Sequence, residues 1–140
     1  MSESLPVRMV HHVGRLTKKL SESRAFYREV LGFQEIPRPN FDFQGAWLFN
    51  YGLQIHLIEN RSIGDGDAAI QTRDNHIALE VDDLDQAERI LAERGIPHRV
   101  NFQADTGRKQ IFFHDPDGHT IEIGSYGKTL TFDMLAERGA

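Results

Sequence analysis

The sequence contains no cysteine, and none of its apolar runs approaches the roughly 18 residues of a membrane-spanning helix. Without cysteine the chain has no disulfide bond, no thiolate nucleophile and no cysteine ligand for zinc. Residues 1–6 lack the apolar core of a secretory signal, which argues against secretion. We therefore expect a cytoplasmic protein that does not bind a membrane.

Clustered positive charge is also missing. The longest basic run is Lys18-Lys19, and 16 basic against 21 acidic residues give a net charge of −5. A nucleic-acid partner is therefore not expected, because binding one requires a basic surface. The apolar share of 39% and the charged share of 26% are typical of a soluble globular protein, and 140 residues are enough for one domain with a real core.

The first half of the chain has the hydrophobic pattern of a strand, a helix and three further strands. We expect these elements at residues 7–16, 21–31, 33–36, 45–50 and 53–58. Ser21 is the expected helix cap, and Gly32 ends the helix. The predicted order of the first half is therefore β-α-β-β-β.

The second half repeats that order, with a helix capped by Asp83. We expect its strands at residues 75–81, 97–102, 109–114 and 119–123. A polar segment at 60–72 is the linker or flap, and 126–140 is a tail with a short helix from Asp133. The prediction is an α+β fold. Two βαβββ units, 7–59 and 73–125, form one domain with a curved mixed sheet and helices outside.

Four side chains that can bind a divalent metal occupy matching places in the two halves. They are His12, His56, His76 and Glu122. The first two are 44 positions apart and the last two 46, and each closing residue comes four positions after a glycine. A duplicated unit with a ligand on its first and last strands can build one site from two copies.

Side-chain direction on the predicted strands supports this interpretation. Neighbouring residues of a strand point to opposite faces. Ile55 and Leu57 therefore face one side and His56 the other. Glu122 opposes its isoleucine neighbours in the same way, and His12 and His76 also oppose apolar rows. Each candidate ligand is thus expected on the face that the helices leave free.

Three imidazoles and one carboxylate suit divalent Fe, Ni, Co, Zn or Mn better than Mg or Ca. Histidine binds metal in its neutral form, so occupancy should fall below about pH 6. A metal with open positions can hold two neighbouring oxygens of a substrate and stabilise an enediolate, with Glu122 as general base. If His56 is not a ligand, it is free for acid–base work. The remaining three ligands then form the face that non-haem iron oxygenases use.

Several stretches of the chain form a recognisable series: His12-Val13 with 24–33, then 75–79, and 113–118 leading to Ile121-Glu122. They resemble the vicinal oxygen chelate superfamily, which includes glyoxalase I, extradiol dioxygenases, methylmalonyl-CoA epimerase and fosfomycin-resistance enzymes. Residues 40–48 and 55–57 look similar to a glyoxalase-I-like subgroup also found in plants. The resemblance extends over most of the chain, from His12 to Ile123.

The resemblance implies one ligand from each of the first, fourth, fifth and eighth strands, which fits the four residues above. It also implies a homodimer that exchanges units, so that one subunit supplies His12 and His56 and the other His76 and Glu122. His11 fits the spacing less well and is expected to point to the helices. Two departures from glyoxalase I stand out: His56 replaces a glutamate-like group, and Leu16 replaces an arginine that often holds glutathione.

The function expected from this resemblance is a divalent-metal-dependent lyase or isomerase of the glyoxalase I type. Its substrate would be a small molecule with vicinal oxygens. An Fe(II) extradiol-type dioxygenase and a non-catalytic binding or resistance protein remain alternatives. The other histidines (98, 114 and 119) and the Asp115-Pro116-Asp117-Gly118 turn are expected to be structural. Phe41 and Phe43 flank a loop near the expected mouth of the site.

Overall fold

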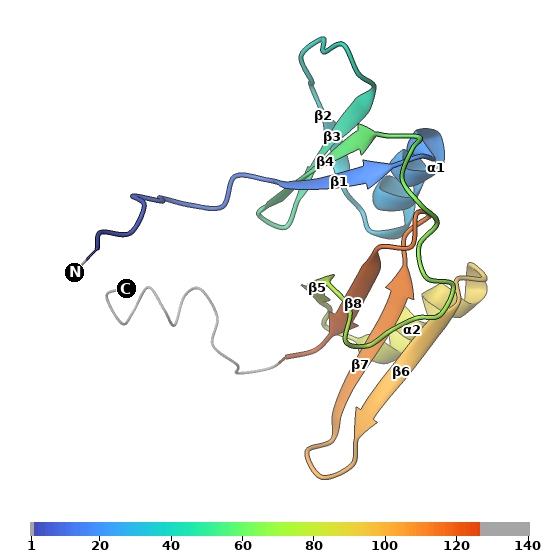
Figure 1. Cartoon of the computed structure of the whole chain (residues 1–140). Coiled ribbons are helices and arrows are strands. Elements are labelled where there is room, and N and C mark those ends of the chain that lie inside the picture. Colours follow the sequence, from blue (N-terminus) through green and yellow to red (C-terminus); the bar gives the residue numbers. More distant parts are fainter. Residues whose placement is uncertain (1, 127–140) are drawn as a thin grey trace. The chain divides into compact units, whose positions relative to one another are not determined.

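The structure is a computed structural model that describes residues 2–126. The chain divides into two compact units (Figure 1). Unit 1 comprises Met1–Gly66 with Asp115–Asp117, and unit 2 comprises Asp67–His114 with Gly118–Ala140. No helix in the described part of the chain is long and apolar enough to cross a membrane. The tail helix expected from Asp133 lies outside the described residues.

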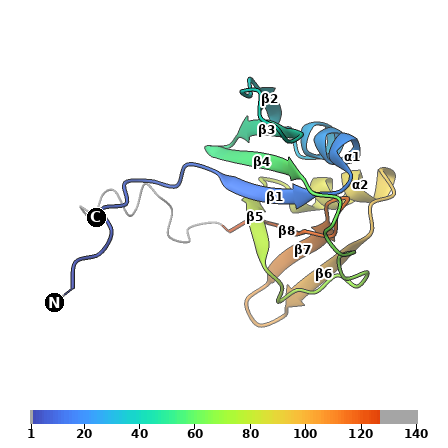
Figure 2. The same cartoon turned by 45° about the horizontal axis from the view of Figure 1, so that its top comes forward.

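Unit 1 is a four-stranded mixed sheet with one helical segment beside it (Figure 2). Its elements are β1 (Val13–Thr17), α1 (Leu20–Ala25), the π-helical η1 (Phe26–Val30), β2 (Gln34–Ile36), β3 (Gly45–Asn50) and β4 (Leu53–Glu59). The strand order is β1-β4-β3-β2, in which β1 runs parallel to β4 and the other pairs are antiparallel.

Unit 2 repeats this topology. Its elements are β5 (His76–Glu80), α2 (Leu84–Glu93), β6 (His98–Gln103), β7 (Arg108–His114) and β8 (Thr120–Gly124). The strand order is β5-β8-β7-β6, again with one parallel pair, β5 with β8. The predicted α+β fold with two βαβββ units is therefore confirmed. The grouping of both units into one domain over 7–125 stays a prediction.

The first strand and the first helix differ from expectation. β1 begins at Val13 rather than at residue 7. Its parallel partner β4 begins at Leu53, and because Val13 pairs with Ile55, residues 7–10 have no β4 residue opposite them. Ser21 is not the helix cap. The helix begins at Leu20, and Lys19 precedes it without a side-chain cap bond. In α2 the predicted cap is confirmed, since Asp83 accepts a 3.0 Å hydrogen bond from the backbone N–H of Gln86.

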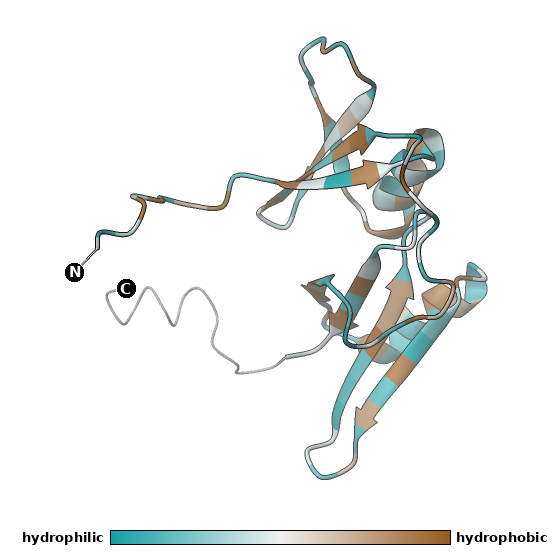
Figure 3. Cartoon of the chain, in the orientation of Figure 1, coloured by the Kyte–Doolittle hydropathy of each residue, from teal (hydrophilic) through white to brown (hydrophobic). Residues whose placement is uncertain are grey.

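Apolar residues of alternating strand positions form the core of each unit. Ile55 and Leu57 are buried in unit 1 together with Leu48, and Ile111 and Ile121 are buried in unit 2. Figure 3 shows these apolar segments on the strands of both units. The row opposite to them on β4 and β8 carries the candidate ligands, as the alternation predicts.

The turn at residues 115–117 does more than reverse the chain, and its contacts agree with the structural role expected of it. Its two aspartates are buried in unit 1. Tyr27 donates its hydroxyl to Asp115 Oδ2 at 2.7 Å, Ser23 donates to Asp117 Oδ2 at 3.0 Å, and the Lys18 backbone N–H donates to Asp117 Oδ1 at 3.0 Å. Burial raises the pKa of Tyr27, and the charge of Asp115 raises that pKa further.

Close packing at the start of β3 gives a testable stability prediction. A Cβ added at Gly45 would clash with the backbone oxygen of Leu57. We expect Gly45→Ala to lower the free energy of unfolding by about 2–3 kcal/mol, because backbone must shift to make room. Gly64→Ala is the control, since no atom lies within 4 Å of the added Cβ. Urea denaturation should separate the two variants, and equal stabilities would contradict the packing described.

Candidate metal centre

Two of the four candidate ligands meet in unit 2. His76 opens β5, and Glu122 lies in the middle of β8. His76 Nε2 is 2.9 Å from Glu122 Oε2. Glu122 is only 4% exposed, so its carboxylate has lost most of its contact with water and requires partners inside the protein.

The second ring nitrogen of His76 shows which of its two nitrogens carries a proton in the neutral ring. Nδ1 lies 2.7 Å from the backbone oxygen of Asp74, to which it must donate. A neutral His76 then turns the lone pair of Nε2 towards the Glu122 carboxylate. Two acceptors 2.9 Å apart require a shared cation, either a proton on Nε2 or a metal ion. Metal-binding histidines commonly donate their other N–H to a carbonyl, and ligand bonds of about 2.1 Å bring neighbouring ligand atoms to about this separation.

The other oxygen of Glu122 accepts two hydrogen bonds that the sequence analysis did not predict. Gln110 Nε2 donates to Oε1 at 2.5 Å and the Tyr126 hydroxyl donates to the same atom at 3.1 Å. Asn101 donates in turn to Gln110 Oε1 at 3.2 Å. Burial raises the pKa of Tyr126, and the nearby charge of Glu122 raises it further, so the phenol remains a donor. Oε1 is thereby fixed, and Oε2 is directed to His76.

The other two candidate ligands meet in unit 1. His12 directly precedes β1 and His56 lies on β4. Their rings stack with centroids 3.9 Å apart and an interplanar angle of 13°. Trp47 covers the opposite face of His56 at 4.2 Å and 7°. His56 is therefore clamped between two parallel rings, while its Nε2 lies 3.1 Å from Oε1 of Gln54.

The surroundings of His56 favour its neutral form. Burial lowers the pKa of the His56 ring, and the neighbouring His12, His11 and Arg38 side chains lower it further. When Nε2–H donates to Gln54, the lone pair of the neutral ring lies on Nδ1. An imidazole in this state is ready to bind metal without first losing a proton.

His11 does not lie where the sequence pattern predicted. We expected it to point to the helices, but its Nδ1 is 2.9 Å from Nδ1 of His12 and its ring centroid is 6.4 Å from that of His56. The prediction was wrong because residues 11 and 12 precede β1, where the strict alternation of a strand does not apply. Within residues 2–126, no three or more His, Asp or Glu side chains are arranged to hold a metal ion. Each unit thus holds one pair of candidate ligands, which we call a half-site.

The pairing registers identify the two half-sites as copies of one another. His56 pairs with Gly14 on the parallel neighbour strand, and Glu122 pairs with Ala78. His12 and His76 each lie two positions before that partner. On the antiparallel side an aromatic residue faces each closing ligand, Trp47 in unit 1 and Phe112 in unit 2. The equal spacings noted in the sequence therefore reflect equal positions in two sheets.

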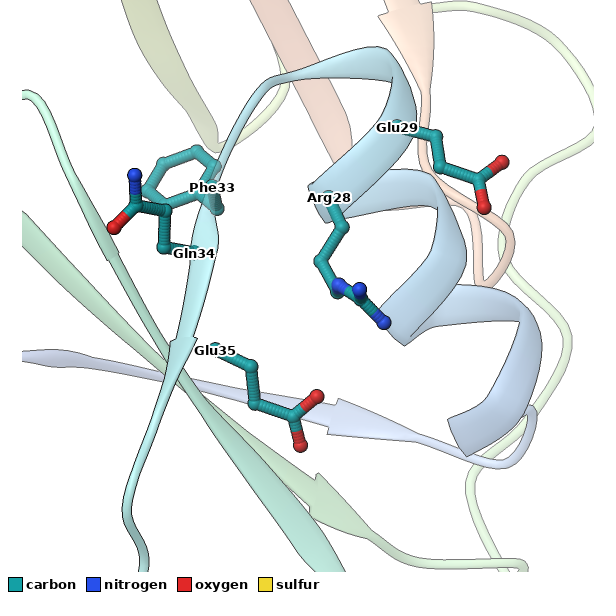
Figure 4. Close-up of a pocket in the computed structure, with 5 residues that line it drawn as sticks. All are labelled: Arg28, Glu29, Phe33, Gln34 and Glu35. Carbon is teal, nitrogen blue, oxygen red and sulfur yellow. The ribbon is translucent and has the colours of Figure 1, made fainter.

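A separate surface pocket of unit 1 lies between η1 and β2 (Figure 4). Its lining residues are Arg28, Glu29, Phe33, Gln34 and Glu35. Glu35 is engaged by Arg24, which donates to both of its carboxylate oxygens at 2.8 and 2.9 Å. The pocket contains none of the candidate ligands, and ion pairs satisfy part of its charge. The half-sites are therefore the stronger candidates for function.

Comparison with known proteins gives consistent matches. The family model described as "Glyoxalase/Bleomycin resistance protein/Dioxygenase superfamily" matches residues 9–123. Glyoxylase I 4 of Arabidopsis thaliana is 40% identical over 120 residues, which are 81% of this chain and 68% of that protein. YwkD of Bacillus subtilis, named an uncharacterized protein, is 31% identical over 84% of this chain and 96% of its own length.

A solved structure supports the fold in the same way. A mutant of the fosfomycin resistance protein FosX from Listeria monocytogenes, complexed with Mn(II) and a dihydroxypropylphosphonic acid, matches with a TM-score of 0.71. The match covers 94% of this chain and 99% of that one at 19% sequence identity. At this identity the likeness concerns the fold alone.

Proposed function

The chain belongs to the Glyoxalase/Bleomycin resistance protein/Dioxygenase superfamily, and from this we propose that it is a metal-dependent lyase or isomerase of the glyoxalase I type. Its substrate is a small molecule that carries oxygens on neighbouring atoms. The relative from Arabidopsis thaliana is named Glyoxylase I 4, which supports the reaction class. The contact between His76 and Glu122 is the single observation that carries the proposal.

The proposed site combines both half-sites around one divalent transition metal, Fe, Ni, Co, Zn or Mn. His12 and His56 contribute from unit 1, and His76 and Glu122 from unit 2. In the proposed homodimer, one subunit supplies the first pair and the other subunit the second. The Mn(II) complex of FosX supports a metal of this class on the same fold. The lowered pKa of His56 and the orientation of His76 support their role as ligands.

When bound, the metal would polarise a substrate carbonyl as a Lewis acid. The protein's own contribution is the movement and placement of protons. Glu122 Oε2, when free of the metal, would accept the proton of the carbon next to that carbonyl and return it to the carbonyl carbon, while the hydroxyl proton passes to the former carbonyl oxygen. Gln110 and Tyr126 would keep Oε1 fixed. A fixed carboxylate loses little freedom during the transfer, which is the advantage of preorganisation.

One observation supports a second candidate function, an Fe(II) dioxygenase of the extradiol type. His56 is clamped between His12 and Trp47, and its Nε2 is engaged by Gln54. If this clamp keeps His56 away from the metal, the remaining ligands are two histidines and one carboxylate, the set of non-haem iron oxygenases. His56 would then exchange a proton with a substrate oxygen.

Metal identity and oxygen dependence test the proposal. The protein should be purified without chelator and without nickel affinity resin, and its metal measured by elemental analysis. Isomerisation of methylglyoxal hemithioacetals formed with glutathione or cysteine should then be followed under argon and under air. We expect bound transition metal and turnover that does not need oxygen. Iron with oxygen uptake on catechols would favour the dioxygenase, and a metal-free protein would overturn both.

Gln110 should act as a positioning residue for Glu122. We expect Gln110→Leu to weaken the binding of Mn(II) by about 10–100-fold, because Oε1 loses its 2.5 Å donor and the carboxylate can turn away. Competition with a chelating dye measures the affinity. Gln103→Leu, at an exposed position on the neighbouring strand β6, is the matched control and should bind normally. Equal affinities of both variants would refute the positioning role.

A further inference from the structure

Two aromatic rings are exposed on the loop between β2 and β3. Phe41 is 43% and Phe43 is 41% exposed. Their rings stack on each other with centroids 5.2 Å apart at 15°. Aromatic side chains usually bury most of their large apolar surface, so a stacked pair at the surface calls for an explanation.

Arg38 holds this pair in place. Its Cζ lies 4.8 Å from the ring centroid of Phe41 and 5.0 Å from that of Phe43. Its Nη2 also donates a 2.7 Å hydrogen bond to the backbone oxygen of Phe43. Arg38 thus holds the loop through both the cation–π contacts and this hydrogen bond. The rings are therefore preorganised, and a ligand that packs on them loses little affinity to ordering the loop.

Trp47 connects these two rings to the half-site of unit 1. Phe41 lies 6.1 Å from Trp47 at a tilt of 45°, and Trp47 stacks on His56 at 4.2 Å. We call the four residues Phe43, Phe41, Trp47 and His56 the aromatic strip. It runs from the exposed loop to a proposed metal ligand without leaving unit 1.

We propose that the aromatic strip binds an aryl group of the substrate, attached next to the two oxygens that the metal would hold. The inference rests on the proposed function, because the metal would place the oxygens at the inner end of the strip. A flat ring can stack on the exposed phenylalanine faces, whereas a methyl group is too small to cover them. The strip thus selects aryl over alkyl substrates with the same pair of oxygens.

Mandelate and lactate form a matched pair of probes, because both carry a hydroxyl and a carboxylate on neighbouring carbons and differ in phenyl against methyl. Binding to the Mn(II)-loaded protein should be measured by titration calorimetry. Fluorescence of Trp47, the only tryptophan of the chain, reports whether the ligand reaches the strip. We expect mandelate to bind roughly tenfold more tightly than lactate, the gain expected from one or two aromatic contacts.

The variant Phe41→Ala/Phe43→Ala should bring the two affinities close to parity, because it weakens the binding of mandelate more than that of lactate. If that variant does not fold, Phe41→Leu/Phe43→Leu keeps the apolar volume and removes the flat faces. Phe102→Ala, at a 61% exposed position on β6 of unit 2, is the control and should keep the preference for mandelate.

Three results would overturn the inference. They are equal affinities of the wild type for both acids, a mandelate preference that survives loss of both rings, and binding of neither acid. Sedimentation analysis adds a further check. If the double variant dissociates an oligomer while the preference persists, the rings belong to an interface between copies instead. Failure of the proposed function is seen separately, in the metal content and turnover experiment above, which uses neither acid.

Discussion

Replacement of Glu122 by alanine should weaken the binding of divalent metal by more than about 100-fold. Loss of a group that only supports a ligand already costs about 10–100-fold, so loss of the ligand itself should cost more. The buried position of Glu122 strengthens this expectation, because His76 would lose the carboxylate oxygen that lies 2.9 Å from its Nε2. Elemental analysis after dialysis against metal-free buffer measures the loss.

The His76→Ala variant should lose metal to a similar degree. His98→Ala is a closely matched control, because His98 also points its Nδ1 to the carbonyl two residues earlier, at 3.0 Å from Ile96 O. Glu93→Ala, in the exposed last turn of α2, serves as the control for the carboxylate. Circular dichroism checks that all four variants fold. Full metal occupancy in the Glu122 and His76 variants would exclude the proposed coordination.

The second large effect is expected at Asp115. Its replacement by alanine removes the acceptor of the Tyr27 hydroxyl and of the Asp117 backbone N–H. Each buried donor left without a partner costs about 1–3 kcal/mol, so we expect a loss of about 3 kcal/mol in the free energy of unfolding. Urea denaturation measures the change. Asp105→Ala, at an exposed loop position, should stay within about 0.5 kcal/mol of the wild type.

Tyr27→Phe removes one hydrogen bond of this network, and its effect on the free energy of unfolding should depend on pH. The folded protein raises the pKa of Tyr27. The contribution of the Tyr27 hydroxyl to the free energy of unfolding is therefore fully present below the ordinary tyrosine pKa of about 10 and is lost as pH rises above it. The stability difference between wild type and variant should therefore be constant from about pH 6 to 9 and shrink above pH 10. A difference that grows above pH 10 would contradict this sign, and a wild-type value for Asp115→Ala would refute the network.

Local patterns in the sequence predicted most of the secondary structure because those patterns act over a few residues. Gly45–Asn50 was predicted with its observed bounds, and Asp83 was predicted as the cap of its helix. The start of β1 was misjudged because a strand needs a partner as well as a pattern. The His11 prediction failed for a related reason, since alternation holds only where the ladder exists.

Local sequence patterns also predicted part of the candidate site. The duplicated spacing and the two-residue alternation predicted the four candidate ligands, and in the structure the two members of each half-site contact each other. Gln110 was not predicted to hold Glu122. The only signal was its place on β7, two positions from the aromatic Phe112 that faces Glu122. A glutamine on a strand is too common to be recognised by type alone.

The sequence alone determined the two βαβββ units and the matching positions of the four candidate ligands, because strand alternation and turn residues are short-range properties. Only the tertiary structure decided which groups meet across long separations. It brought Asp115 to Tyr27, 88 positions away, and clamped His56 between Trp47 and His12. Such contacts depend on which strands pair and in what register, and a local pattern of apolar and polar residues does not specify that pairing.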